Sequence, residues 1–113
     1  MKKDNPIEVI KRFSTDKETK QKLMELLIKQ LSHQVQHLQT CILNEDWDEI
    51  KKVCHKMKST FTFLKMSRPS ELTEILRNEA GIDILITTQQ LHELENICLQ
   101  IISDVKNELK NNF

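Results

Sequence analysis

The segment Asp46–Met66 reads DWDEIKKVCHKMKSTFTFLKM and decides the fold class of this chain. An α-helix turns about 100° per residue, so side chains three and four positions apart share one face. Apolar residues recur here at those spacings, and the opposite face is polar. The pattern predicts an amphipathic helix whose apolar face packs on a core. Its inward positions are Ile50, Val53, Met57, Phe61 and Leu64.

His55 lies near the centre of the polar face of this predicted helix. Six of its helical neighbours lie within about 60° of it on the wheel, and each of the six is polar. An imidazole in that place is expected to stand in solvent, and at cytoplasmic pH it is mostly in the neutral, nucleophilic form. A surface histidine without a specific role is the alternative interpretation. The polar neighbours are Asp48, Lys51, Lys52, Lys58, Ser59 and Thr62.

Basic residues gather around His55. Between Glu49 and Glu71 there is no acidic side chain, but there are five lysines and one arginine. The whole chain carries 17 Lys and Arg against 17 Asp and Glu, so the basic run is a local patch. Such a patch suits a phosphoryl group or an acidic protein surface. We expect no nucleic-acid partner, because such proteins are broadly basic and this chain has 4% aromatic residues and no tyrosine.

Residues 54–61 (CHKMKSTF), with the flanking segments 46–48 and 64–66, resemble the signature helix of histidine-containing phosphotransfer (HPt) domains. The family pattern is a small residue, His, any residue, an aliphatic residue, Lys and a small residue, with a Leu-Gly turn downstream. The resemblance implies that His55 is the phosphoryl-accepting histidine. In length and helix order it extends over almost all 113 residues.

The same resemblance implies roles for two neighbours of the histidine. Met57 matches the buried aliphatic position, and Lys58 matches the lysine beside the phosphoryl group. The sequence departs from the family pattern at two places. Ser59 stands where many members have glycine, and Lys65 stands where a glycine often follows the leucine.

The function implied is that of a phosphoryl carrier in a two-component phosphorelay, not an enzyme in its own right. A receiver domain of a response regulator would dock over His55 and bring its own Mg²⁺ and aspartyl phosphate, so no cofactor of the chain itself is expected. A histidine kinase or hybrid kinase is the further partner. Phosphoryl transfer depends chiefly on positioning and charge stabilisation, so one nucleophile and one cation suffice from this side. The docking face would include Lys51, Lys52, Ser59 and Thr62.

Two other function classes compete with the carrier. A non-catalytic helical adaptor could use the same basic face to bind or inhibit an acidic signalling domain, and Ser59 in place of glycine favours this alternative. An enzyme with an internal pocket would need inward-pointing polar groups, which none of the predicted helices offers.

The remaining helices are predicted from capping residues and periodicity. Asn5-Pro6 opens a short helix to about Phe13, and the capping box Thr15–Glu18 opens a long helix to about Leu43. Ser67 is expected to cap a fourth helix. The later predictions are Gly81 as the end of that helix, a loop at 82–86 packed across one bundle end, and Thr87–Gln90 as the cap of the last helix.

These helices predict an all-α fold, an antiparallel up-down four-helix bundle with a short extra N-terminal helix, formed by a single domain over residues 1–113. The chain has one Gly and two Pro, too few turn-forming residues for a β-protein with many short turns. Three Cys without a CxxC arrangement indicate buried thiols in a reducing compartment. No apolar run of about 18 residues and no signal peptide is recognisable, so we expect a cytoplasmic protein without membrane insertion.

Two pairs of potential metal ligands raise the question of a metal site. His33 and His37 lie four apart on one helix, a spacing that can hold a metal, but no acidic or cysteine partner is indicated on that face. His92 with Glu95 is interpreted as a surface pair. We therefore expect no metal site.

Overall fold

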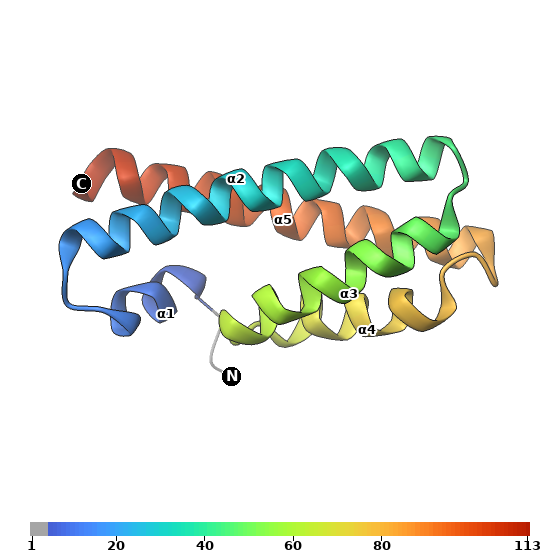
Figure 1. Ribbon diagram of the computed structural model, residues 1–113, viewed down its shortest axis with the longest axis horizontal. Helices are drawn as coiled ribbons and strands as arrows, with labels where there is room; N and C mark the ends of the chain where they lie inside the picture. The colour runs from blue at the N-terminus through green and yellow to red at the C-terminus, as the bar shows by residue number, and fades with distance from the viewer. Residues whose placement is uncertain (1–4) are drawn as a thin grey trace.

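The computed structural model describes residues 5–113, which form five α-helices and no β-strand (Figure 1). The last helix has 29 residues and thus a length of about 43 Å. The molecule is 44 Å long, so this helix spans it from end to end. The predicted all-α class is confirmed. The helices are α1 (Pro6–Phe13), α2 (Lys17–Leu43), α3 (Trp47–Phe63), α4 (Ser67–Glu79) and α5 (Ile84–Asn112).

The helices pack into a bundle. Helix α2 contacts α3 and α5, and α4 contacts the same two helices, so these four surround a shared core. The short N-terminal helix expected from the sequence is present as α1, which packs on α2 and α5 (Figure 1). No helix within residues 5–113 combines the length and the apolar character that crossing a bilayer requires.

The core consists of the apolar faces that periodicity predicts. The five predicted inward positions, four within α3 and Leu64 directly after it, are all buried. The interior also includes Cys54 and Cys98, which are both fully buried. Apolar residues also recur at three-four spacing along the two long helices, and these are buried except for the partly buried Ile42 and Leu109. The buried ones include Met24, Leu27, Leu31, Val35, Leu38, Leu91, Leu94, Ile101 and Val105.

Two of the predicted helix starts are confirmed in atomic detail. The Asn5 side chain accepts a hydrogen bond from the Ile7 backbone N–H at 3.1 Å, with Pro6 in the first turn of α1. The Asp46 carboxylate accepts one from the Glu49 N–H at 3.2 Å at the start of α3. Each cap satisfies one backbone donor that the helix itself leaves without a partner.

Two other caps were predicted one residue away from the true one. The cap of α2 is Asp16 and not Thr15, and its carboxylate accepts hydrogen bonds from the Thr19 backbone N–H and hydroxyl. The cap of α4 is the backbone of Met66, so Ser67 is the first helical residue and not the cap. Several consecutive polar residues precede or begin each of these two helices, and residue type alone does not determine which position is the cap.

The prediction for the beginning of α5 is wrong. Residues 82–86 do not form a loop packed across the bundle end, because α5 already begins at Ile84 with Asp83 as its cap. Thr87 is not a cap but a buried residue, and its hydroxyl accepts a hydrogen bond from the Gly81 N–H at 3.1 Å. The apolar side chains around this start therefore face outward.

Gly81 ends α4 as predicted, and it also brings two turns together. Its φ of +89° lies in the left-handed region that favours glycine. An added Cβ atom would lie 2.6 Å from Cγ of Trp47, so the tryptophan ring packs directly on the glycine backbone. The α2–α3 turn and the α4–α5 turn thus meet at the same end of the bundle (Figure 1). Trp47 therefore packs between the two turns at this end of the bundle.

Helix α3 ends at Phe63, three residues before the predicted end at Met66, because Lys65 adopts a φ of +56°. A left-handed conformation costs a residue with a Cβ atom about 1 kcal/mol relative to glycine. Lys65→Gly is therefore expected to raise the free energy of unfolding by about 0.5–1 kcal/mol. Urea denaturation would measure the change, with the mid-helix variant Lys106→Gly, which should lose about 1 kcal/mol, as the matched control. A destabilised Lys65→Gly protein would contradict the assigned backbone conformation.

Candidate functional site

His55 lies in the middle of α3, and its side chain is exposed to solvent. The helix is held in register by the buried side chains of Cys54 and Met57 on either side of the histidine. This arrangement follows from the amphipathic pattern, which sends the neighbours inward and the imidazole outward. A nucleophilic ring on a rigid helix is thus accessible to another macromolecule.

The residues predicted to surround His55 are found on the same solvent-facing side of α3. Lys52, Ser59 and Thr62 are exposed, and Lys51 is partly exposed. Within residues 5–113, neither Lys51, Lys52 nor Lys56 forms an ion pair. The positive charge of these three lysines is therefore available to an approaching anion.

Lys58 is held by a different helix. Its ammonium group donates a hydrogen bond to the Glu74 carboxylate of α4 at 2.6 Å, and Arg77 lies 3.4 Å from the same oxygen. The hydrogen bond from Lys58 is the main reason that the pKa of Glu74 lies below its usual value. The lysine predicted to stabilise a phosphoryl group is thus charge-paired in this structure. Both groups remain about 40% exposed, so the pair can exchange partners.

Arg68, the last basic residue of the predicted patch, is also paired. Its guanidinium contacts Glu93 of α5 through two nitrogens, at 2.6 and 2.7 Å, and Glu71 of α4 at 2.6 Å. These hydrogen bonds, the one to Glu93 foremost, raise the pKa of Arg68 above its ordinary value. Fewer basic side chains are therefore available around His55 than the sequence suggested, because Lys58 and Arg68 pair with carboxylates.

The hydroxyl groups of the predicted docking face donate to the helix itself. The Ser59 hydroxyl donates to the Lys56 carbonyl at 3.0 Å, and the Thr62 hydroxyl donates to the Lys58 carbonyl at 2.9 Å. Because each hydroxyl proton is donated to a carbonyl of the same helix, the hydroxyl oxygen has lone pairs left for a partner. Both side chains are therefore suited to accept hydrogen bonds at an interface.

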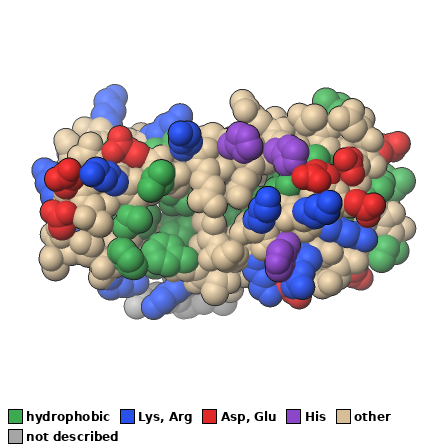
Figure 2. Space-filling model, in the orientation of Figure 1, with side chains coloured by type: hydrophobic (Ala, Val, Ile, Leu, Met, Phe, Trp, Pro, Cys, Tyr) green, Lys and Arg blue, Asp and Glu red, His purple; other side chains and the backbone are tan. Residues whose placement is uncertain are grey.

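An apolar groove of about 430 Å³ opens beside the histidine, between α1, α2 and α3. Ser59, one helical turn from His55, and Lys56 lie on its rim. Figure 2 shows a hollow lined by hydrophobic side chains on a face that also carries histidines and lysines. The lining residues are Ile10, Leu23, Leu26, Leu27, Gln30, Lys56, Ser59, Thr60, Phe63 and Leu64.

Sequence reasoning missed this groove, although two signals for it exist. Leu26 and Phe63 lie outside the apolar stripes of their helices, and both are exposed. The Phe63 ring makes an edge-on contact with Phe13 of α1, with ring centroids 5.5 Å apart. Apolar residues outside the buried face of their helix, on two neighbouring helices, were the signal in the sequence for a hydrophobic surface near His55.

The two histidines of α2 have a partner that the sequence did not indicate. The rings of His33 and His37 are stacked at 6.5 Å, and Nε2 of His37 lies 3.2 Å from the Glu49 carboxylate of α3. The expectation that neither an acidic residue nor a cysteine faces this pair was wrong, because Sγ of Cys41 also lies 3.9 Å from Nε2 of His37. Within the described residues, however, no three His, Cys, Asp or Glu side chains come together in a group that could hold a metal ion. His92 is exposed, as interpreted.

The three thiols are free and buried, as predicted. Burial raises the pKa of Cys54 and of Cys98 to about 12. Because the thiolate is the reactive form, neither sulfur serves as a nucleophile near neutral pH. Burial, followed by the charges of Asp46 and Glu49, also raises the pKa of Cys41.

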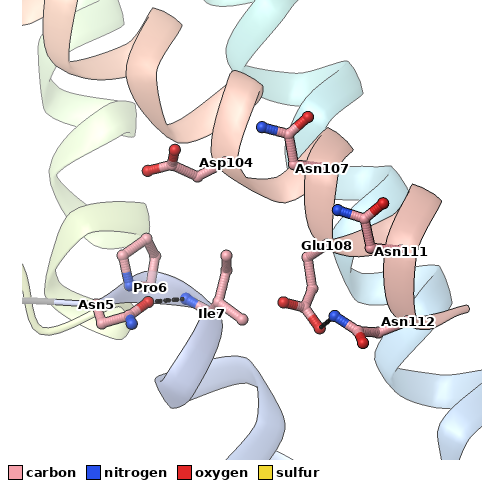
Figure 3. Close-up of a pocket in the computed structure, with 8 residues that line it drawn as sticks. All are labelled: Asn5, Pro6, Ile7, Asp104, Asn107, Glu108, Asn111 and Asn112. Carbon is pink, nitrogen blue, oxygen red and sulfur yellow. Dashed lines mark hydrogen bonds between the residues drawn. The ribbon is translucent and has the colours of Figure 1, made fainter.

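A second hollow, of about 400 Å³, lies between the start of α1 and the end of α5 (Figure 3). Its lining is rich in asparagine, and its two carboxylates already have partners. Glu108 accepts a hydrogen bond from Asn112 and pairs with Lys11, and Asp104 accepts one from Gln100. No nucleophile is present among its lining residues, so His55 and the adjoining groove form the candidate site.

Comparison of the chain with models of protein families, with characterised proteins and with solved structures gave no significant match. The candidate site is therefore interpreted from its own chemistry.

Proposed function

We propose that this protein is a histidine phosphocarrier of the HPt type, which accepts a phosphoryl group on His55 from a receiver-domain aspartate and passes it to another receiver. In this proposal the four helices α2 to α5 form the antiparallel up-down bundle of that family, and the protein works in the cytoplasm beside its receivers and a histidine or hybrid kinase. The chain is a carrier and not an enzyme, because the receiver contributes the metal ion and the rest of the active site.

One observation carries the proposal: a solvent-exposed imidazole in the middle of a helix, with an apolar groove beside it and neighbouring lysines that form no ion pair within residues 5–113. A reaction confined within this protein would need a pocket that excludes water, and His55 is not in one. A domain that docks over the helix would supply that exclusion. The groove gives such a domain an apolar anchor, and Lys51 and Lys52 attract its acidic active-site face.

The proposed transfer step uses few groups of this chain. The neutral His55 ring attacks phosphorus in line, so a P–N bond forms while the P–O bond to the partner's aspartate breaks and its carboxylate leaves with the electron pair. The imidazolium proton is lost to solvent from the other ring nitrogen. Lys58 exchanges Glu74 for the phosphoryl oxygens, and Lys51 and Lys52 add positive charge nearby.

Glu74 is expected to limit how well Lys58 serves the phosphoryl group. Glu74→Gln removes the competing carboxylate charge, so phosphotransfer to His55 should become faster, by at most about fivefold because the pair is exposed. Rapid-quench measurement of the label on this chain would determine the rate. Glu71→Gln is the matched control, since Glu71 lies on the same helix but pairs with Arg68. A rate that falls in Glu74→Gln would show that the ion pair positions Lys58 productively.

The test of the function is direct transfer. Receivers from the source genome, phosphorylated with radioactive phosphate, are incubated with the purified chain. The carrier proposal expects label on this chain that is labile in acid and stable in base, the behaviour of a phosphoramidate. Absence of label with every receiver would refute the proposal.

The ion pair between Lys58 and Glu74 favours one alternative, the non-catalytic adaptor that binds or inhibits an acidic signalling domain through the same face. An adaptor has no use for a free Lys58, and Ser59 in place of glycine fits it as well. His55→Ala separates the two functions. Binding and regulation of the partner both survive in an adaptor, whereas a carrier keeps binding and loses regulation.

A further inference from the structure

An exposed apolar surface lies at the bundle end where the two turns meet, around the start of α5. We name it the end surface, and it consists of Leu43, Ile82, Ile84, Leu85 and Ile86. Their exposed fractions are 85%, 76%, 54%, 69% and 50%. Four of the five lie within five consecutive residues, and the contact between Trp47 and Gly81 brings the end of α2 to the same end of the molecule.

The apolar residues of the end surface do not serve the core of this chain. The first turn of α5 reads Ile-Leu-Ile, whereas a helix start in water usually carries polar residues. Helix α5 is anchored by the next residue, Thr87, which is buried and bonded to Gly81. Clustered apolar side chains that contribute nothing to the interior mark a contact site for another molecule.

The surroundings of the end surface are acidic. Residues 42–50 and 78–92 contain six carboxylates and no lysine or arginine. Two of the six cap helices, Asp46 and Asp83, and Glu49 contacts His37. The other three, Glu45, Asp48 and Glu79, form no ion pair within residues 5–113. This end of the molecule therefore has an apolar centre and a negative rim.

A small hollow in the end surface matches one kind of side chain. It has a volume of about 90 Å³ and lies between Ile82 and Ile86, with Glu79 and Asp83 at its edge. An aliphatic stem fits between the isoleucines, and a terminal cation reaches the carboxylates. Lysine and arginine combine these two features.

We propose that the end surface binds an amphipathic helix of a partner protein that has an apolar face flanked by lysine or arginine. The apolar face covers the isoleucines and leucines, and the flanking cations pair with the acidic rim. The negative rim disfavours an anionic membrane as the occupant. This site does not involve His55, so it stands or falls independently of the phosphocarrier function.

The experiment measures binding of a fluorescent model helix of leucine and lysine, about 18 residues or five turns long. A peptide in which glutamate replaces lysine is the charge control. We expect the lysine peptide to bind, the glutamate peptide not to bind, and the affinity to fall when NaCl rises from about 50 to about 500 mM. Ile82→Ser combined with Leu85→Ser should weaken binding at least about tenfold.

The matched control for these substitutions is Leu99→Ser, which alters an exposed leucine on α5 away from the end surface. It should leave binding unchanged. All the substituted side chains are exposed, so circular dichroism should show an intact fold for each variant. Equal binding by the doubly substituted protein would overturn the proposal. So would self-association, or binding to anionic vesicles, that the double substitution abolishes, because either would identify a different occupant.

Discussion

His55→Gln is expected to reduce the acid-labile phosphate on this chain by at least about 100-fold. Glutamine keeps much of the size and polarity of histidine but has no nucleophilic ring nitrogen, so the P–N bond cannot form. The His55 side chain is exposed, so its replacement removes little buried surface. The free energy of unfolding should therefore stay within about 0.5 kcal/mol of the unsubstituted protein. Labelling from a phosphorylated receiver measures the first effect, and urea denaturation measures the second.

The other histidines provide matched controls for this result. His33→Gln and His92→Gln each remove an exposed imidazole from a different helix and should leave labelling unchanged. Label that persists in His55→Gln would sink the carrier assignment, and its disappearance in His33→Gln or His92→Gln would move the acceptor to that helix. A folded His55→Gln protein that still binds the receiver would show that the loss is chemical.

Gly81→Ala is expected to lower the free energy of unfolding by about 3 kcal/mol. Part of this loss comes from the φ of +89°, which costs a residue with a Cβ atom about 1–2 kcal/mol. The remainder comes from overpacking, since the new methyl group would lie 2.6 Å from Cγ of Trp47. For a domain of this size, the melting temperature should fall by roughly 10–20 °C. Thermal and urea denaturation followed by circular dichroism would check both values.

A double-mutant cycle separates the two causes of this loss. Trp47→Ala removes the ring that the new methyl group would strike, so Gly81→Ala should cost less in that background than in the unsubstituted protein. The cost that remains in the Trp47→Ala background reports the backbone strain alone. Strictly additive losses, or a Gly81→Ala protein as stable as the parent, would show that the ring does not pack on the glycine.

Most of the helical architecture could be predicted from the sequence because it depends on local patterns. The five inward positions predicted around α3 are all buried, since a three-four spacing of apolar residues favours one face, but Cys54 is buried as well and is not one of the five. The start of α5 was predicted wrongly because local patterns there allow two interpretations. The apolar Ile84 and Ile86 suggested a buried loop, and two residues that can cap a helix, Asp83 and Thr87, lie only four positions apart.

Some properties of the candidate site could be predicted from the sequence, and others could not. The exposure of His55 followed from the helical wheel, and so did the placement of Ser59 and Thr62 beside it. The charge state of its surroundings did not follow. Glu74 lies 16 residues after Lys58 in the sequence, and nothing in the local pattern indicates that their helices place them 2.6 Å apart.

By itself, the amino-acid sequence determined the all-helical class, the buried faces and the outward direction of His55, because each depends on the order of polar and apolar residues within one helix. Only the tertiary structure decided which cations pair with carboxylates of other helices, where the apolar groove opens, and that an acidic rim surrounds the end surface. Those properties arise between helices. They depend on which faces pack against each other, and a pattern within one helix carries no information about the side chains that another helix presents to it.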